Sequence, residues 1–299
     1  MFVKRTSENC LVIGAPAKVN LDLKVLRKRE DGYHDIDSLF QAVSLFDRLT
    51  FERVDRSDRA ELTVTNGVNL PTDEANLIVK AFNLLKLRFG FRGGIRVELE
   101  KNIPVAAGLG GGSSDGAATI LAVRILFDLP LDFSEMAKLG LELGSDLPFF
   151  FGSGQAHVTG RGEIVTDLDL PTDYWLVLVT PGFEVSTAEA YAALKMPLTK
   201  PVAARSFRGW KAPADLVKWL ADIGNDFERV QLAAFPELTE TKLRLAQSGA
   251  VLVRLSGSGP TVFGLYIGAP ELEGDRAFGR SNWIVSTVKP IRLPARLIS

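Results

Sequence analysis

The feature that most constrains this chain is a glycine-rich segment, residues 102–119, between an expected strand and an expected helix. Apolar alternation predicts the strand over residues 94–100, and an apolar run predicts a buried helix over residues 117–127. The turn between them contains Gly108, Gly110, Gly111, Gly112, Ser113 and Ser114. Because glycine has no side chain, this backbone can adopt positive φ and approach a ligand closely.

The helix after these glycines predicts what the ligand is. We expect it to begin near Ser113 or Ser114, so that its unpaired N–H groups and positive dipole end face the turn. This arrangement is typical of a phosphate site. A Walker loop does not fit because no lysine follows the glycines, and a dinucleotide fingerprint would need a glycine at Ser113. A flexible loop capped by a serine stays open as the structural alternative.

The composition excludes several classes of protein. The chain has 299 residues, 46% hydrophobic, with 35 basic and 36 acidic residues and a net charge of −1. We therefore expect no nucleic acid and no membrane as partners. A single cysteine, Cys10, excludes internal disulfides, and residues 1–9 lack a signal-peptide core. We expect a cytoplasmic protein of two domains.

The pattern of strands and helices predicts the α+β class, because the two do not alternate strictly. The first half reads as β-rich, with strands over residues 10–15, 19–26, 36–45, 49–54 and 61–65. Helices are expected over residues 77–89, capped by Asp73, and 134–143, capped by Ser134 and ended by Gly144. A hairpin is expected over residues 155–168. A strand over 174–180 opens a second half of helices and three further strands, the last over 283–288.

Two charged residues are candidates for catalysis. Lys18 lies in Ala15-Pro-Ala-Lys-Val-Asn20, where it is either a surface charge or a ligand for anionic oxygen. Asp146 follows Gly144 and precedes the apolar residues 147–151. It is either the N-cap of a short turn or a buried carboxylate held by Lys18 and placed to accept a hydroxyl proton.

A turn, Asp31-Gly-Tyr-His34, exposes Tyr33 and His34 near the N-terminus. Its glycine suits a β-hairpin. A histidine in a turn is commonly just solvated, so a binding role for His34 rests on more than this turn.

Taken together, residues 16–20, 104–118 and 255–259 resemble the three motifs of the GHMP kinases (galactokinase, homoserine, mevalonate and phosphomevalonate kinases). The resemblance narrows to members that phosphorylate a cytidine-diphosphate sugar alcohol for isoprenoid synthesis. The segments that narrow it are Asp31-Gly-Tyr-His34, Ser38-Leu-Phe-Gln41, Gly110-Gly-Gly-Ser-Ser-Asp115 and Leu143-Gly-Ser-Asp146. The chain departs from the family pattern at Ala106, at Gly116 and in a short polar stretch over residues 269–282.

This resemblance implies the domains and the ligands. An N-terminal ribosomal-protein-S5-like domain is expected over residues 1–168 and a C-terminal ferredoxin-like domain over residues 169–299. The site is expected in the cleft between them. The implied ligands are ATP, Mg²⁺ and the cytidyl substrate, and the metal ligands stay open.

The resemblance also implies site residues. Lys18 and Asp146 would be catalytic. Residues near ATP would be Asn76, Lys101, Pro104, Gly108, Leu109, Gly110, Gly111, Gly112, Ser113 and Ser114, with Asn76 and Lys101 near the adenine. Residues near the cytidyl substrate would be Asn20, Tyr33, His34, Phe40, Thr187 and Tyr191.

Two alternatives stay open. One is another small-molecule kinase of the same family, acting on mevalonate or homoserine. The other is a non-catalytic nucleotide-binding or RNA-binding module on an S5-like fold, against which the near-neutral charge and the Lys18 and Asp146 pair count. In either kinase reading we expect small-molecule partners and a monomer or a weak homodimer.

Overall fold

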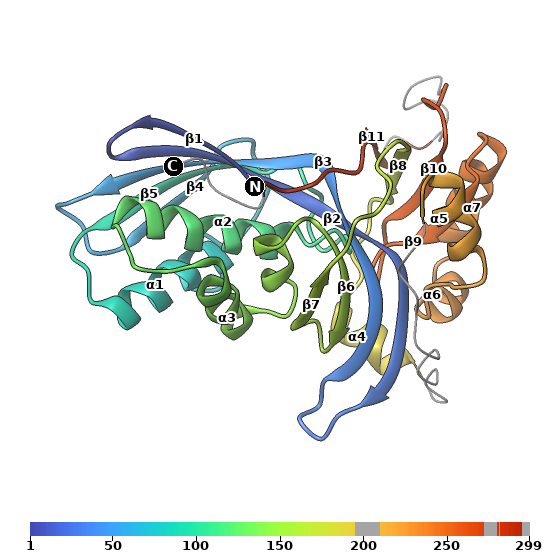
Figure 1. Ribbon diagram of the computed structural model, residues 1–299, viewed down its shortest axis with the longest axis horizontal. Coiled ribbons are helices and arrows are strands. Elements are labelled where there is room, and N and C mark those ends of the chain that lie inside the picture. The colour runs from blue at the N-terminus through green and yellow to red at the C-terminus, as the bar shows by residue number, and fades with distance from the viewer. Residues whose placement is uncertain (195–209, 272–279, 281, 295–299) are drawn as a thin grey trace.

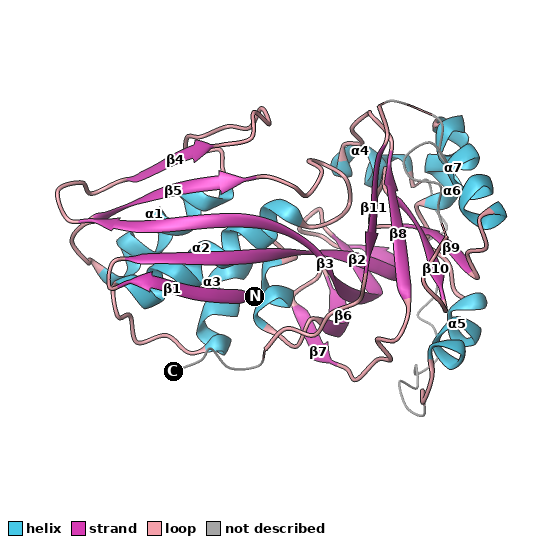
Figure 2. Ribbon diagram, turned by 90° about the horizontal axis from the view of Figure 1, so that it is seen from above, coloured by secondary structure: helices cyan, strands magenta, loops and turns pink. Residues whose placement is uncertain are grey.

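The computed structural model describes residues 1–194, 210–271, 280 and 282–294. These residues form two sheets; helices pack along one face of the first sheet and against both faces of the second (Figures 1 and 2). The expected α+β class is confirmed.

The first sheet belongs to the N-terminal half. Its described strands run in the order β1-β2-β3-β5-β4, with β6 paired to β3 and β7 to β6. Neighbours are antiparallel except the parallel pair β4 and β5. The strands are β1 (Phe2–Ser7), β2 (Cys10–Lys28), β3 (His34–Val54), β4 (Ala60–Val64), β5 (Gly94–Glu100), β6 (Gln155–Gly160) and β7 (Ile164–Asp167).

Strands β2 and β3 are longer than the sequence predicts. The predicted break near Pro16 is wrong, because β2 runs on from Cys10 to Lys28 and stays paired with β3. The pairing of β1 with β2 ends at Gly14, so Pro16 has no neighbour on that side to receive an N–H. A register shift after Pro16 absorbs the irregularity. The predicted break between residues 45 and 49 is also wrong, because β3 runs from His34 to Val54 and stays paired with β2. Strand β1 was not predicted.

Three helices and a short 3₁₀ turn cover one face of this sheet (Figure 2). They are α1 (Leu77–Phe89), α2 (Gly111–Leu126), α3 (Phe133–Leu143) and η1 (Leu147–Phe151). Between sheet and helices lies an apolar core that includes Phe51, Phe82 and Ile120.

The helix ends correct three predictions. The N-cap of α1 is Asn76, whose side chain accepts a hydrogen bond from Ile78 N, and not Asp73. The N-cap of α3 is Asp132, which forms a capping box with Glu135, and not Ser134. Helix α2 begins at Gly111, before the predicted start.

The second sheet belongs to the C-terminal half, and its described strands run in the order β11-β8-β10-β9. The strands are β8 (Trp175–Thr180), β9 (Leu252–Leu255), β10 (Val262–Tyr266) and β11 (Ile284–Val288). The helices of this half are α4 (Thr187–Ala193), α5 (Pro213–Ala221), α6 (Glu228–Ala234) and α7 (Pro236–Gln247). Most of the stretch 269–282 lies outside the described residues.

The two halves share an apolar core, and the chain after β11 links the second half back to the first sheet. Val19 and Leu21 of β2 pack in one apolar cluster with Phe263 of β10. After β11 the chain returns to the first sheet, where Ser44 N donates to Lys289 O at 2.9 Å and Ile291 N to Ala42 O at 2.9 Å. These contacts hold the two halves together on either side of a site. A domain boundary at residue 168 stays a proposal.

Candidate active site

A cavity of about 1080 Å³ lies where the two halves meet. Its wall contains every residue that the sequence predicts for the site except Ser114. Ser114 is fully buried in α2, and its hydroxyl has no hydrogen-bond partner among the described residues. Ser114 therefore does not line the cavity, and its role in binding ATP stays a prediction.

The glycine-rich loop forms one wall, and its conformation explains its composition. Gly108 and Gly110 have φ of 74° and 68°, in the left-handed region that glycine adopts at little cost. Gly111 and Gly112 are already helical, as the first residues of α2. Gly110 is the N-cap and makes no side-chain bond, so the serine-capped alternative is wrong. Ala106, a departure from the family pattern, has φ of 50°.

The loop is tied down by its carbonyl groups. Lys18 N donates to Leu109 O at 2.9 Å, and Ser256 Oγ donates to Gly108 O at 2.9 Å. A Cβ on Gly108 would lie 2.2 Å from Ser256 O, so only glycine allows this approach. The first N–H groups of α2 have no partner within the helix and open toward the cavity. This geometry supports the phosphate-binding interpretation.

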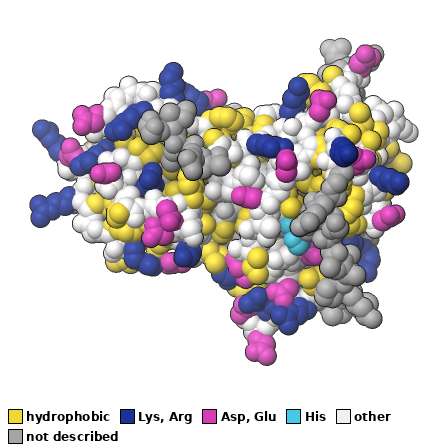
Figure 3. Space-filling view, in the orientation of Figure 1, with side chains coloured by type: hydrophobic (Ala, Val, Ile, Leu, Met, Phe, Trp, Pro, Cys, Tyr) yellow, Lys and Arg dark blue, Asp and Glu magenta, His cyan; other side chains and the backbone are white. Residues whose placement is uncertain are grey.

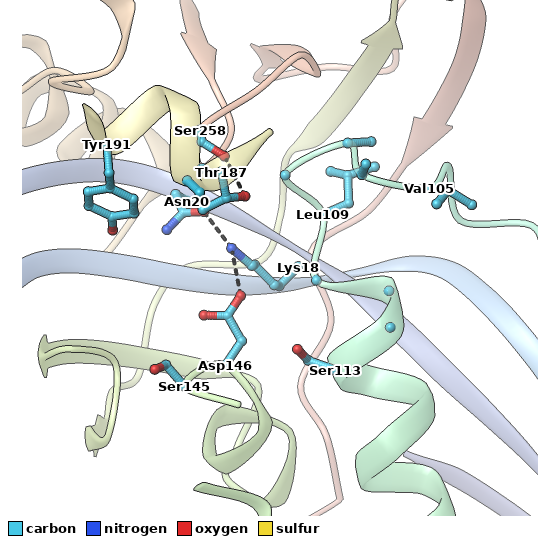
Figure 4. Close-up of a pocket in the computed structure, with 18 of the residues that line it drawn as sticks. Lys18, Asn20, Val105, Leu109, Ser113, Ser145, Asp146, Thr187, Tyr191 and Ser258 are labelled. Atoms are coloured by element: carbon cyan, nitrogen blue, oxygen red, sulfur yellow. Dashed lines mark hydrogen bonds and ion pairs between the residues drawn. The ribbon is translucent and has the colours of Figure 1, made fainter. Parts of the chain in front are cut away.

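Lys18 lies beside this loop on β2 and is only 3% exposed, which excludes the surface-charge interpretation. Its ammonium donates to Asn20 Oδ1 at 2.7 Å and lies 3.4 Å from Asp146 Oδ2 (Figure 4). The ammonium also lies 4.5 Å from the ring centroid of Phe40. A buried ammonium needs such partners, and an aromatic face is one of them.

Asp146 stands at the N-terminus of η1, but its side chain makes no capping hydrogen bond. The side chain therefore does not cap this turn. The expectation of a fully enclosed carboxylate is also wrong, because the side chain is 32% exposed. Its carboxylate faces Lys18, and Ser113 points from the start of α2 into the same space (Figure 4). Asp146 is thus open to a ligand while still paired with Lys18.

Aromatic side chains gather at the other end of the cavity. His34 and Tyr191 stack with ring centroids 4.8 Å apart and an interplanar angle of 21°. Tyr33 is exposed, and the Arg161 guanidinium lies 4.8 Å from its ring centroid. Phe40 also lines the cavity but is almost fully buried behind Lys18, so it supports the ammonium.

The ionisation of this end follows from burial. Burial lowers the pKa of His34, and the charge of Lys28 lowers it further, so the imidazole is neutral at pH 7. Burial raises the pKa of the Tyr191 hydroxyl, and the charge of Asp146 raises it further. Both rings therefore meet a ligand uncharged, as stacking and hydrogen-bonding surfaces.

Sequence reasoning missed several residues of the wall. Ser258 shares a hydrogen bond of 3.1 Å with Thr187 (Figure 4). Ser256 ties the loop as described above. The signal for both was the glycine turn over residues 256–260. Asp115 also lines the cavity; it ends the segment 110–115 that narrows the resemblance, but that segment gave no role for its side chain.

The predicted ATP contacts Asn76 and Lys101 line the cavity with side chains already engaged. Asn76 Nδ2 donates to Pro71 O at 2.8 Å, while its oxygen caps α1. Lys101 Nζ lies 2.5 Å from Asp47 and 2.6 Å from Asp115. Contact of either residue with adenine stays a prediction.

The surface and the remaining chemistry add little. On the face in Figure 3, basic and acidic side chains are intermingled. Within the described ranges, no group of three His, Cys, Asp or Glu side chains could hold a metal ion by itself. Also among the described residues, no helix has the length and apolarity to cross a membrane.

Two family models match this chain. The model for the GHMP kinases N terminal domain matches residues 76–154, and the model for the GHMP kinases C terminal domain matches residues 203–280. The first covers the glycine-rich loop and Asp146. These matches confirm the expected pair of domains, S5-like followed by ferredoxin-like.

Individual proteins resemble the chain over nearly its whole length. The 4-diphosphocytidyl-2-C-methyl-D-erythritol kinase of Syntrophus aciditrophicus (strain SB) is 42% identical over 94% of this chain and 99% of its own. The enzyme of that name from Bacillus mycoides (strain KBAB4) is 42% identical over 85% of this chain and 88% of its own. A crystal structure of 4-(cytidine 5'-diphospho)-2C-methyl-D-erythritol kinase has a TM-score of 0.70 and 35% identity, covering 93% of this chain and 99% of that one.

The packing behind the loop predicts that Gly111→Ala weakens ATP binding. An added Cβ would lie 2.9 Å from Ile103 Cγ2 and 3.0 Å from Lys101 Nζ, so either the first turn of α2 or these two side chains behind it must shift. We expect at least an about tenfold loss of affinity, or about 1.4 kcal/mol, in equilibrium binding of ATP.

The matched control is Gly224→Ala, where an added Cβ meets nothing within 4 Å. This variant should bind ATP as the parent does. An affinity of Gly111→Ala within about threefold of the parent would contradict the phosphate-binding interpretation.

Proposed function

The chain belongs to the GHMP kinase family, and we propose that it is an ATP-dependent kinase for the 2-hydroxyl of 4-diphosphocytidyl-2-C-methyl-D-erythritol. This reaction is a step of the non-mevalonate route to isoprenoid precursors. The names of relatives 42% identical over most of the chain support the substrate. The observation that carries the proposal is one cavity with a phosphate loop, a Lys18–Asp146 pair and an aromatic end.

The geometry supplies what phosphoryl transfer needs, namely positioning and charge neutralisation. The N–H groups at the start of α2 would hold the phosphates of ATP. An ammonium has three N–H donors, so Lys18 can bind a phosphate oxygen while it holds Asn20 and Asp146. The charge that develops on the transferred group would thus meet a fixed positive partner.

Asp146 is the proposed acceptor of the hydroxyl proton. Its carboxylate is exposed to the cavity, and Lys18 fixes its orientation. No other acidic side chain of the described cavity wall has this setting, because Asp115 is buried against Lys101. Proton removal would make the hydroxyl oxygen a better nucleophile as it attacks the γ-phosphorus.

The donor set also fits a magnesium ion that binds with ATP. Magnesium prefers one or two carboxylates and completes its shell with water and substrate phosphates. Asp146 and the hydroxyl of Ser113 both face the space where the phosphates would lie. We propose these two as the protein groups near the ion, which would neutralise phosphate charge.

The aromatic end would hold the cytosine. Neutral His34 offers hydrogen bonds, and the rings of Tyr33 and Tyr191 offer stacking faces. Thr187 and Ser258, which hydrogen-bond to each other, lie between this end and Lys18 (Figure 4). The proposed acceptor would therefore reach from the aromatic end to Asp146.

The same aromatic set argues against mevalonate and homoserine, which carry no nucleobase. ADP release measured with the cytidyl substrate, mevalonate and homoserine decides between these substrates. Turnover with mevalonate or homoserine alone would overturn the proposal. Filter binding to RNA tests the non-catalytic module, for which ATP turnover should be absent.

We propose small molecules as the partners, and a monomer or weak homodimer in the cytoplasm as the working state. Sedimentation of the purified protein at several concentrations measures the oligomeric state.

Asp146→Asn should slow the chemical step with little effect on binding. The substitution keeps the shape of the side chain but removes its charge and basicity. We expect kcat to fall by ~10²–10⁴, the usual range for general acid–base catalysis. Both KM values should change little, because proton transfer contributes mainly in the transition state.

Steady-state kinetics on Asp146→Asn, Lys18→Met and the double variant measure this, with circular dichroism to confirm folding. The double variant should lose much less than the product of the single losses, because the two side chains are in contact. If folded Asp146→Asn keeps more than about a tenth of the parent kcat, the base lies elsewhere.

Tyr191→Ala should raise KM for the cytidyl substrate and leave KM for ATP unchanged. The ring that stacks on His34 is lost, and stacking contributes ~1–3 kcal/mol per base. Tyr191→Phe is the matched control, since it keeps the ring and should keep a near-parental KM. Equal losses toward both substrates in Tyr191→Ala would show that the residue supports the fold and does not bind cytidine.

A further inference from the structure

A buried hydroxyl stands behind the ammonium of Lys18, and the proposed reaction gives it no role. Ser38 is fully buried in β3 and lies outside the cavity wall. Its segment, Ser38-Leu-Phe-Gln41, is one of those that narrow the family resemblance. The hydroxyl cannot touch a ligand in this cavity, so any part that it takes in the reaction passes through another side chain.

That other side chain is Asn20, which connects the hydroxyl to the ammonium. Lys18 Nζ donates to Asn20 Oδ1 at 2.7 Å, and Asn20 Nδ2 donates to Ser38 Oγ at 3.0 Å. Ser38 Oγ in turn donates to the carbonyl oxygen of Asp22. The four groups form one chain of hydrogen bonds that starts at the ammonium and ends on the backbone of β2.

The direction of each bond in this chain follows from the groups themselves. An ammonium can only donate, so the amide of Asn20 turns its oxygen toward Lys18 and its nitrogen toward Ser38. A hydroxyl has one proton, and Ser38 gives that proton to Asp22 O, so toward Asn20 it can only accept. A reversed amide would place its N–H groups against the ammonium. Ser38 therefore stabilises the one orientation of the amide that binds Lys18.

A β-bulge in β2 lies at the centre of this arrangement. The pairing of β2 with β3 shifts register between Asn20 and Asp22. The side chain of Asp22 continues the pairing there, because its Oδ1 accepts from Leu39 N at 2.7 Å. The carbonyl oxygen of the same residue accepts from Ser38. Bulges commonly redirect side chains beside active sites, and this one separates the amide that binds the ammonium from the carbonyl that binds the hydroxyl.

The bond to Asn20 controls how the ammonium of Lys18 is presented to the cavity. An ammonium has three N–H groups. One donates to Asn20, and the ammonium lies 3.4 Å from Asp146 Oδ2 on another side (Figure 4). The third N–H is left for an anionic oxygen in front of the loop. Rotation of the Asn20 amide would remove an acceptor that fixes this arrangement, and the third N–H would no longer point at one place.

We propose that Ser38 is a positioning residue for phosphoryl transfer, which fixes the amide of Asn20 and through it the ammonium that the transferred phosphate would meet. The inference deepens the proposed function and rests on it in taking Lys18 as the catalytic charge. The effect is one of orientation, so it is largest in the transition state, where charge develops on the transferred group. Binding of ATP and of the acceptor in the ground state changes little.

The test is steady-state kinetics on Ser38→Ala with ATP and the cytidyl substrate. Loss of the hydroxyl leaves the amide of Asn20 without its acceptor. We expect kcat to fall about tenfold, which corresponds to about 1.4 kcal/mol in the barrier. Both KM values should stay within about twofold of the parent. Circular dichroism of each variant confirms that it is folded.

The coupling to Asn20 is tested by repeating the substitution in the Asn20→Ala variant. If Ser38 acts through the amide, its removal has no further effect once the amide is gone. Asn20→Ala and the double variant should therefore have kcat values within about twofold of each other, both below that of the parent. A residue that only supports the sheet would lower kcat by the same factor in both backgrounds.

Two further variants serve as controls. Ser248→Ala removes a hydroxyl with similar bonds outside the cavity wall, because Ser248 Oγ donates to Leu245 O at 2.9 Å and shares a bond of 2.7 Å with the hydroxyl of Tyr266. It should keep the parental kcat. Ser38→Thr keeps the hydroxyl and should restore kcat to within about threefold of the parent. If Ser38→Ala does not fold, Ser38→Cys replaces it, since a thiol keeps the shape but is a weaker acceptor.

A folded Ser38→Ala with the parental kcat would overturn this inference. So would equal losses of kcat in the parent and Asn20→Ala backgrounds, or a loss confined to the KM values. Failure of the folded parent to turn over ATP with the cytidyl substrate, mevalonate or homoserine would overturn the proposed function, and the inference with it. Turnover with mevalonate or homoserine alone would overturn only the proposed substrate, and the same variants measured with that acceptor would then decide the role of Ser38.

Discussion

The phosphate loop is held by its carbonyl oxygens, and the rest of the site follows from that constraint. Leu109 O accepts from the backbone of Lys18, and Gly108 O accepts from the side chain of Ser256. With the carbonyls bound on the protein side, the N–H groups at the start of α2 are left for a ligand. Because Lys18 holds the loop by its backbone, its side chain emerges at a fixed distance from the same N–H groups. One strand residue thus fixes both the loop and the position of the ammonium beside it.

This arrangement depends on β2 continuing past the end of β1. After Gly14 one edge of β2 has no strand beside it, and that edge pairs first with the loop and then with residues 224–226. Leu23 N donates to Gly224 O at 3.1 Å, and Asp226 N donates to Leu23 O at 2.9 Å. Strand β2 is therefore the common support of the loop and of the second half. A cavity between two halves keeps its shape because both halves pair with one strand.

The sequence predicts the parts of this site that depend on local pattern. Four glycines before an apolar helix indicate backbone contact with phosphate, and Lys18 and Asp146 are conspicuous as charges in apolar segments. The period of apolar residues likewise gives the α+β class. What fails depends on partners elsewhere in the chain. Pro16 breaks a strand only where a neighbouring strand needs its N–H, and here none lies on that side. Nothing in the sequence around Asp47 or Asp115 predicts that either side chain contacts Lys101.

The two buried lysines show how exposure assigns different roles to similar ion pairs. Lys18 pairs with a carboxylate that is 32% exposed, so substrate can reach Asp146 and exchange a proton with it. Lys101 pairs with carboxylates that are 0% and 4% exposed, so no substrate atom can replace either partner. A sealed pair resists rearrangement because breaking it leaves an uncompensated charge in the core. The sealed pair is therefore suited to hold β3 and α2 to the residue after β5, while the open pair is suited to contact a ligand. The start of α2 lies between these pairs, because Gly110 is next to Lys18 and Gly111 is next to Lys101, so one short turn of backbone joins an open ion pair to a sealed one.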